Sequence, residues 1–308
     1  MNGDRGGEQV NFETIRYEVK DGIATVTLNR PEVFNAMNSQ MMSEIMAVFD
    51  VTDRNDSVRA VVVTGEGKGF CGGADLSKGA DIFDKNRNGS AAKESLLRED
   101  GSFDYSKESA RDGGGKLALR IFNSLKPVIG AINGAGVGVG ASMLLPMDIR
   151  IASEKARLGF VYARRGIVYE CCSSWFLPRI VGISKALEWS FCGRVMSAQE
   201  LLEGGLVSHL VPHEQLLPKA YEIAREIADN TAPVSIALMR QMAWRSLGMS
   251  HPMEAHRIES RGICTRGRSP DAKEGVQSFV EKRLPKFSCK VSADMPDYFP
   301  WWDEPSYS

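Results

Sequence analysis

The segment at residues 126–148, KPVIGAINGAGVGVGASMLLPMD, constrains the fold of this chain more than any other. An apolar, strand-like run opens into glycines at every second position from Gly134 to Gly140, and a second apolar run follows. Glycines leave backbone amides without side-chain cover, so a ligand can lie directly against the main chain. The pattern predicts a strand, a loop that contacts a negatively charged group, and a helix.

A second glycine-rich turn, GEGKGFCGGAD at residues 65–75, follows the β-branched run VVVT at 61–64. Two strand-to-glycine-turn junctions in one domain can aim two backbone N–H groups at one oxygen atom, which is what an oxyanion hole requires. The pair of turns therefore points to catalysis on an acyl group.

The bulk composition fits one large α/β domain with an appendage. The chain has 308 residues, of which 43% are hydrophobic and 25% are charged. Its 38 Lys+Arg balance 39 Asp+Glu, so it carries no electrostatic footprint for nucleic acid. No run approaches the roughly 20 apolar residues of a membrane span. Neither nucleic acid nor a membrane is expected as a partner.

The cysteines and the two ends of the sequence favour a cytoplasmic location. The six cysteines form no CxxC pair, and the adjacent Cys171 and Cys172 make a poor disulfide, so we expect reduced thiols. The sequence starts with polar and acidic residues, unlike a secretory or organellar signal, and its final SYS is not a peroxisomal SKL.

Local patterns before the second glycine segment predict alternating strands and helices. Residues 17–28 are expected to form a hairpin that turns at Asp21 and Gly22. From Asn38 the apolar residues recur at helical spacing, and a strand is expected at 60–64. Strand, helix and strand in this order predict a right-handed parallel crossover.

After the second glycine segment the spacing predicts a helix near residues 142–145 and a strand at 149–152. Beyond residue 184 the chain is expected to be mainly helical, with a capping box at 197–200 and helices at 214–229 and 233–246.

Three regions are expected: a core at 12–211, a helical C-terminal region at 212–285, and an aromatic, proline-rich tail at 286–308. At about 77–115 the core is interrupted by a segment rich in Gly, Asp, Lys and Ser. We interpret this segment as a flexible insertion that covers the acyl end of the site, with a passive solvated insertion as the alternative.

Six blocks in this order resemble the enoyl-CoA hydratase/isomerase, or crotonase, superfamily, and the resemblance covers residues 12–285. The blocks are LNRPEVFNAMN (28–38), GFCGGADL (69–76), KPVIGAINGAGVGVGASMLLPMDIRIAS (126–153), RRGIVYECCSSWFLPRIVG (164–182), ALEWSFCGRVMSAQELLEGGLVSHLV (186–211) and KEGVQSFVEKR (273–283). The resemblance implies an α/β fold with a crotonase-like ββα superhelix core and a helical C-terminal trimerisation region. The family assembles as trimers, commonly paired into hexamers, so a homotrimer or homohexamer is expected.

For the chemistry, the resemblance places the thioester oxygen on the backbone amides of Ala74 and Val139. An amide donor aimed at a developing enolate oxygen in a dry site is worth about 2.7 to 4 kcal/mol of barrier. The alternative is that the glycine turns only permit close packing of helix and strand.

The acid/base is expected to be Glu170. Hydratases of the family use two glutamates, and the matching positions here hold Ser142 and Tyr162. Glu170 lies where the family's Δ3,Δ2-enoyl-CoA isomerases carry their base. Apolar neighbours would partly desolvate its carboxyl and raise its pKa, whereas the alternative is a surface glutamate before a helix start.

One carboxylate can serve two reactions. In hydration of a trans-2-enoyl-CoA, Glu170 would activate water and deliver a proton in turn, with Tyr162 or Ser142 orienting the water. In isomerisation the same group takes and returns a proton. A hydratase is the leading hypothesis because hydration is the commonest family activity, and an isomerase is the second. A non-catalytic acyl-CoA-binding protein is a third, because both hydratase carboxylates are missing.

The resemblance implies that coenzyme A enters as part of the thioester substrate, without a separate cofactor. It assigns substrate and CoA contacts to the two glycine turns, to the loop before the first helix, and to a C-terminal helix that often reaches across a subunit boundary. The residues are Asn35, Ala36, Met37, Asp75, Leu76, Gly138, Phe279 and Lys282.

A nicotinamide dehydrogenase is the strongest rival from another class. Residues 136–141 satisfy GxGxxA after a strand, and Glu154 lies near the expected ribose-binding position. However, that motif usually follows the first strand of its domain, and the second glycine turn would be left unexplained. A serine hydrolase is excluded because Ser142 lies outside a GxSxG elbow. The four histidines lack metal-ligand spacing, so no metal is expected.

Overall fold

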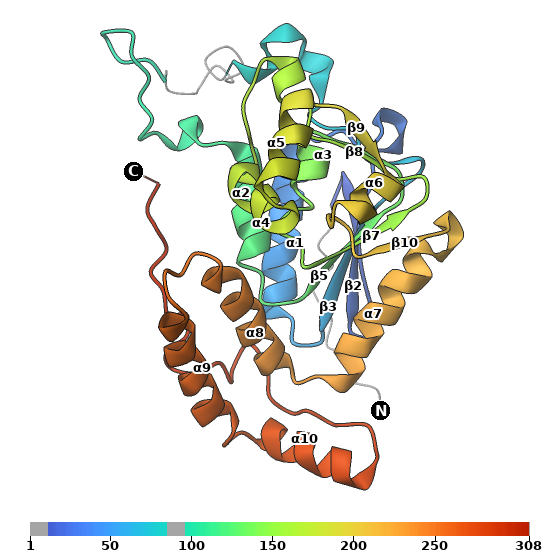
Figure 1. The fold of residues 1–308 in the computed structure, drawn as a ribbon, viewed down its shortest axis with the longest axis vertical. Coiled ribbons are helices and arrows are strands. Elements are labelled where there is room, and N and C mark those ends of the chain that lie inside the picture. Colours follow the sequence, from blue (N-terminus) through green and yellow to red (C-terminus); the bar gives the residue numbers. More distant parts are fainter. Residues whose placement is uncertain (1–11, 85–95, 308) are drawn as a thin grey trace.

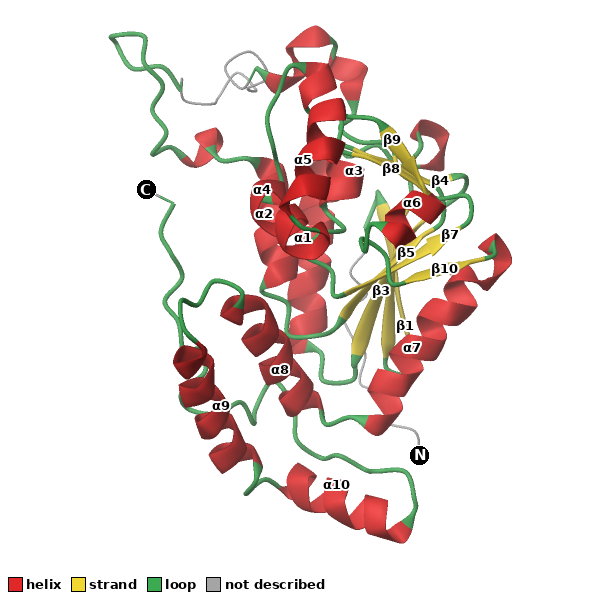
Figure 2. Cartoon of the chain, in the orientation of Figure 1, coloured by secondary structure: helices red, strands yellow, loops and turns green. Residues whose placement is uncertain are grey.

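The computed structural model describes residues 12–84 and 96–307, in which two β-sheets are surrounded by helices (Figures 1 and 2). The larger sheet has the strand order β1-β2-β3-β5-β7-β10, and the smaller has the order β4-β6-β8-β9. The larger sheet comprises β1 (Ile15–Lys20), β2 (Ile23–Leu28), β3 (Ala60–Gly65), β5 (Val128–Ile132), β7 (Ile149–Ser153) and β10 (His209–Val211). The smaller comprises β4 (Gly69–Cys71), β6 (Ala135–Val137), β8 (Arg157–Gly159) and β9 (Val195–Ser197).

The helices follow the strands in alternation and then dominate the C-terminal third. They are α1 (Ser39–Arg54), α2 (Gly113–Phe122), α3 (Val139–Ser142), α4 (Ser173–Val181), α5 (Ile183–Cys192), α6 (Ala198–Glu203), α7 (Leu216–Asn230), α8 (Pro233–Ser246), α9 (Pro252–Arg266) and α10 (Pro270–Glu281).

The predicted hairpin is confirmed. Strands β1 and β2 pair antiparallel with Lys20 opposite Ile23, so the turn has two residues. Asp21 and Gly22 both have positive φ, 50° and 78°, as the tight hairpin turns that match strand twist require.

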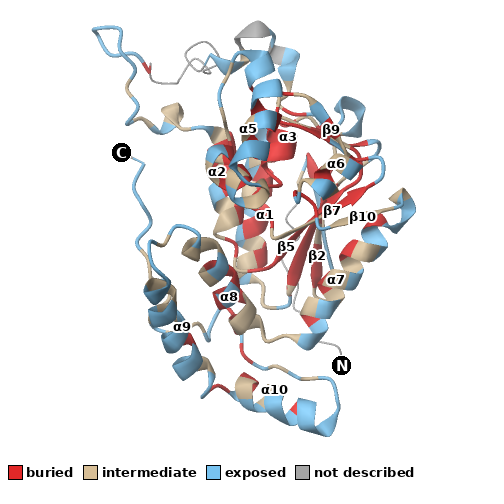
Figure 3. Cartoon of the chain, in the orientation of Figure 1, coloured by how far each residue is buried: buried red, intermediate tan, exposed pale blue. Residues whose placement is uncertain are grey.

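The predicted strand–helix–strand crossover is also confirmed. Helix α1 connects β2 to β3, which pair in parallel. The Asn38 side chain caps α1 by accepting a hydrogen bond from the Met41 N–H at 2.8 Å. Alternate residues of β3 enter different cores: Val61 and Val63 pack toward α1, and Val62 packs toward α7. Figure 3 shows the resulting buried centre of the sheet.

The alternating glycines are explained largely by close backbone packing. A Cβ atom on Gly134 would lie 2.0 Å from the Lys68 carbonyl oxygen, and one on Gly140 would lie 2.1 Å from that of Cys71. Only glycine permits this contact between the two glycine turns, which pair as β4 and β6. Close packing, which the sequence left open as an alternative, therefore accounts for these two positions.

The short helix after the glycine loop begins earlier than predicted. The spacing predicted a helix near residues 142–145, whereas α3 spans Val139–Ser142. The reason is Gly138, whose φ of 54° turns the chain so that Val139 is the first helical residue. A Cβ atom at Gly138 would meet nothing within 4 Å, so this glycine faces open space.

The expected insertion at 77–115 includes residues 85–95, which lie outside the described part of the chain. Its described residues include the short 3-10 helices η2 (Leu76–Lys78), η3 (Ala80–Phe83) and η4 (Glu108–Ala110). Helix α2 begins inside the range, at Gly113, because the Asp112 side chain accepts hydrogen bonds from the N–H groups of Gly114 and Gly115. This cap offsets the poor helix propensity of three successive glycines.

The C-terminal third is helical, as predicted, and the capping box at Ser197 and Glu200 is present. The last helices, α9 and α10, extend away from the sheets and are largely exposed (Figure 3). The tail returns over α8, where Phe299 and Trp301 pack on a small core formed by Val234 and Leu238. None of the helices in residues 12–84 and 96–307 is long and apolar enough to cross a membrane.

Candidate active site

A cavity of about 270 Å³ lies between the two glycine turns, the start of α2 and the loop before α4. It brings together seven of the residues that the sequence assigned to the site. These are Met37, Ala74, Leu76, Gly138, Val139, Tyr162 and Glu170. Residues from segments more than 100 positions apart thus meet at one place.

The two predicted oxyanion residues are both in the wall of this cavity. Met37 forms a parallel bridge with Ala74: its N–H donates to Gly73 O at 2.7 Å, and its carbonyl accepts from Asp75 N at 2.9 Å. In such a bridge the N–H of the middle residue, Ala74, points away from the partner strand. Val139 is the first residue of α3, so its N–H has no acceptor within that helix. Both amides are therefore available to a ligand.

Glu170 lies in the turn that precedes α4, and its carboxyl faces the cavity. Its Oε1 atom is buried and accepts no hydrogen bond from the described residues. Burial raises the pKa of the Glu170 carboxyl, and Asp112 adds to the rise, while the Cys171 and Ser142 side chains oppose it. A carboxyl with a raised pKa and a free oxygen atom suits proton transfer.

Ser142 and Tyr162 form a chain of hydroxyl groups behind Glu170. Ser142 Oγ lies 2.5 Å from Tyr162 Oη and 2.9 Å from Gly138 O, and Tyr162 Oη lies 3.0 Å from Ser173 Oγ. Ser173 donates in turn to the Glu170 carbonyl. These four contacts share three hydroxyl protons, so one contact always lacks a proton.

Burial, with Glu170 nearby, raises the pKa of Tyr162, so its phenol stays protonated. The network therefore holds neutral hydroxyls at the two positions that were predicted from the resemblance to match the hydratase glutamates.

Two further residues of the cavity wall escaped the sequence reasoning. Asp112, the cap of α2, lines the cavity and also accepts a hydrogen bond from Cys171 N at 2.9 Å. The available signal was an acid directly before a helix start, but it lay inside the range interpreted as an insertion. Arg165, at the end of η5 (Ala163–Arg165), also lines the wall.

The predicted coenzyme A contacts divide into two groups. Met37, Leu76 and Gly138 line the cavity, and Leu76 is 53% exposed at its rim. Asn35 is buried; its side-chain amide donates to Glu66 O and Gly69 O in the first glycine turn and accepts from Arg30 N in its own loop. A role of Asn35 in binding remains a prediction. Asn35 would act by holding the shape of its loop.

Arg30 connects the neighbouring predicted contacts. Its guanidinium donates to Ala36 O and pairs with Asp75 at 2.9 Å. This ion pair joins the loop before α1 to the first glycine turn, and it fixes their relative position at the cavity rim.

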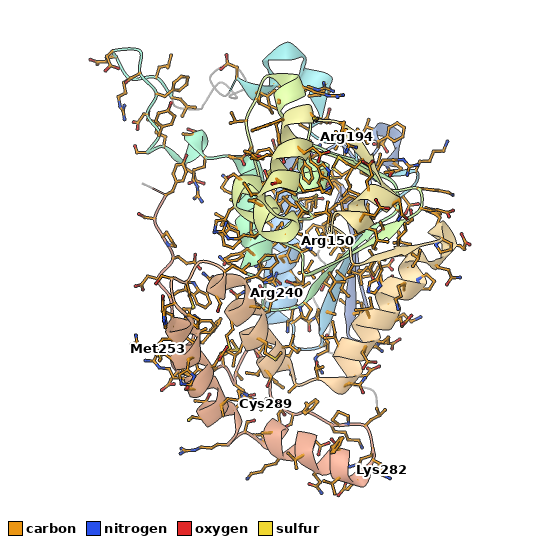
Figure 4. All side chains as sticks on the ribbon, in the orientation of Figure 1. Arg150, Arg194, Arg240, Met253, Lys282 and Cys289 are labelled. Carbon is orange, nitrogen blue, oxygen red and sulfur yellow. The ribbon has the colours of Figure 1, made fainter. Side chains whose placement is uncertain are left out.

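Phe279 and Lys282 are not brought to the cavity within one chain. They belong to the end of α10, which lies at the opposite end of the molecule from α3 (Figures 1 and 4). Phe279 is 83% exposed. Any contact with coenzyme A would have to be made in a neighbouring subunit, as the sequence analysis anticipated.

The fold and the cavity define a class of protein: an α/β chain in which two glycine turns present main-chain amides beside a buried acid. Comparison with known proteins agrees. A model of the enoyl-CoA hydratase/isomerase family matches residues 18–290. The chain belongs to this family, whose members act on acyl-CoA substrates, and its fold is crotonase-like.

Three similar proteins illustrate the range of the family. The chain is 42% identical over 268 residues to an enoyl-CoA hydratase of Alternaria alternata, covering 87% of this chain and 83% of that one. It is 31% identical over 286 residues to the 1,2-epoxyphenylacetyl-CoA isomerase of Escherichia coli, covering 91% and 100%. A crystal structure of an enoyl-CoA hydratase from Bacillus anthracis superposes with a TM-score of 0.76 at 28% identity, covering 89% and 99%.

Proposed function

We propose that this enzyme is an enoyl-CoA hydratase that adds water across the double bond of a trans-2-enoyl-CoA. The observation that carries the proposal is the position of Glu170: its buried, unpaired Oε1 atom belongs to the same cavity as the Ala74 and Val139 amides. A proton-transfer group and two oxyanion donors are what addition to an α,β-unsaturated thioester needs.

The proposed reaction uses one carboxyl twice. Ionised Glu170 takes a proton from water as the water oxygen bonds to C3, and the electrons of the double bond move to the thioester oxygen. The Ala74 and Val139 amides hold the resulting enolate. Protonated Glu170 then gives its proton to C2, which yields a 3-hydroxyacyl-CoA and restores the carboxylate. The Tyr162 or Ser142 hydroxyl would orient the water.

A Δ3,Δ2-enoyl-CoA isomerase is the second candidate. It is supported by the mutual hydrogen bond of Ser142 and Tyr162, two hydroxyl residues at the positions where the resemblance implies the hydratase glutamates. In this reaction Glu170 would remove a proton from C2 of a 3-enoyl-CoA and return it to C4 through a dienolate held by the same amides.

We further infer that the acyl-CoA is bound without a separate cofactor and that the protein forms a homotrimer or homohexamer. The support for assembly is the exposed end of α10, where Phe279 and Lys282 would need a neighbouring subunit to approach coenzyme A.

The test is turnover of crotonyl-CoA and of a 3-enoyl-CoA by the purified protein, with products identified by mass. A gain of one water by crotonyl-CoA supports the hydratase. Conversion of the 3-enoyl-CoA alone, without change of mass, would replace it with the isomerase. Binding of both without turnover would favour a non-catalytic acyl-CoA-binding protein.

A further inference from the structure

The turn that carries Glu170 has an unfavourable backbone. Cys171 and Cys172 are successive non-glycine residues with φ of 53° and 52°, in the left-handed region. Such conformations persist only where surrounding contacts impose them, and they cluster at functional sites. Contacts outside the turn must therefore hold it in place.

Asp112 supplies the most direct of these contacts. Its carboxylate accepts from Gly114 N at 3.1 Å and Gly115 N at 2.6 Å, which caps α2, and from Cys171 N at 2.9 Å, which ties the turn to the same helix. One side chain thus fixes the start of α2 and the residue after Glu170, although 59 positions separate the two segments.

Gly114 supplies the space that the Glu170 carboxyl occupies. A Cβ atom on Gly114 would lie 2.6 Å from Glu170 Oε2 and 2.6 Å from Cys171 Sγ. A Cβ atom on the preceding Gly113 would meet Met42 Sδ instead. Of the first two glycines of α2, only Gly114 thus makes room for the acid.

We propose that the Asp112-Gly113-Gly114-Gly115 start of α2 is a cradle that sets the position of Glu170, with Asp112 and Gly114 as positioning residues for the reaction. The inference rests on the proposed role of Glu170 as acid/base. Asp112 fixes the backbone of the Glu170 turn, and the missing side chain at Gly114 fixes where the carboxyl can lie.

The charge of Asp112 gives the cradle a second effect. The titratable and charged groups around Glu170 are Asp112 before α2, Tyr162 beside η5, Cys71 in β4, Cys171 and Cys172 in its own turn, and Arg165 on the cavity wall. The thiols and the phenol have raised pKa values and stay neutral; the charged neighbour that adds to the rise in the pKa of Glu170 is Asp112. Its charge disfavours ionisation of Glu170.

The first test is Gly114→Ala, assayed on the enoyl-CoA that the native enzyme turns over. The added methyl group meets the ends of two side chains rather than backbone, so the variant should fold. We expect kcat to fall by about 10²-fold with KM little changed, because an ångström-scale shift of a reacting group has that effect. Gly275→Ala in α10, where a Cβ would make ordinary contact with Phe287 at 3.6 Å, is the matched control and should keep native kcat.

The second test is Asp112→Asn, which removes the charge and keeps the size of the side chain. Its one oxygen can still accept from Gly115 N and Cys171 N, while the bond from Gly114 N is lost. The acidic limb of the kcat profile should move to lower pH, a change that a purely structural role would not cause. If Gly114→Ala does not fold, the pH profile of kcat for Asp112→Asn tests the proposal.

Native kcat in Gly114→Ala together with an unmoved profile in Asp112→Asn would overturn the cradle, provided that Glu170→Gln is inactive. Full activity of Glu170→Gln would instead overturn the proposed function itself, so the two failures are distinguishable.

Discussion

Replacing Arg240 with methionine should lower the free energy of unfolding by more than replacing an arginine of an exposed ion pair does. The Arg240 side chain in α8 (labelled in Figure 4) is 4% exposed and contacts the end of α2 and Asp148, directly before β7. Its guanidinium pairs with Asp148 at 2.8 Å and donates to the carbonyls of Ile121 at 2.9 Å, Phe122 at 2.7 Å and Ser124 at 2.6 Å. Arg240 therefore donates both to a carboxylate and to the carbonyls at the end of α2 that have no partner within the helix.

The expected loss follows from what Arg240→Met leaves behind. Asp148 would keep hydrogen bonds from Trp244 Nε1 and Val128 N, both at 2.7 Å, but would lose its cation. Breaking one side of a buried ion pair costs about 3–5 kcal/mol. Methionine fills most of the volume of the arginine side chain, but the carbonyls that lose their donor add a cost of their own. The expected loss therefore stays within that range.

The assay is urea unfolding at one fixed protein concentration, because assembly would make the midpoint concentration-dependent. Arg194→Met is the matched control. Arg194 pairs with Glu188 and Glu200, but its side chain is 36% exposed, so its loss should cost less than about 1 kcal/mol. Equal losses in the two variants would refute the reasoning.

Three further predictions concern charge, the tail and assembly. Because the pKa of Glu170 is raised in the folded protein, its contribution to stability is present at low pH and is lost as pH rises through that pKa. The melting temperature of Glu170→Gln minus that of the native protein should therefore be larger near pH 8 than at about pH 4. Trp302→Ala should lower the free energy of unfolding by about 0.5–2 kcal/mol, because the Trp302 ring stacks 3.3 Å from the Arg245 guanidinium, and an unchanged urea midpoint would contradict this. Light scattering should report a mass of three or six chains, and a mass near 33.8 kDa would contradict assembly.

Much of the fold could be predicted because its signals are local. The two-residue turn at Asp21 and Gly22, the helical spacing that begins at Asn38 and the β-branched run of β3 each depend on neighbours in the sequence. The site was predicted through the resemblance, and Ala74, Val139, Tyr162 and Glu170 do share a cavity.

What escaped prediction depends on partners distant in the sequence. Asp112 bonds to Cys171, and the three glycines after it gave no helical signal, so the predicted insertion ran to about residue 115, past the start of α2 at Gly113. The close packing of Gly134 and Gly140 could not be separated from ligand contact, because both need a bare backbone. The short helix α3 was predicted at the wrong residues because its start is set by the φ of Gly138, which a spacing pattern does not report.

The most direct test of the central claim is kcat of Glu170→Gln on the enoyl-CoA that the native enzyme turns over. The amide keeps the size of the side chain but cannot take a proton from water or carbon, so kcat should fall by about 10²- to 10⁴-fold. Binding of the substrate and the folded state should be retained, which isothermal titration and thermal melting would check. A folded Glu170→Gln variant with native kcat would contradict the assignment of Glu170 as the acid/base.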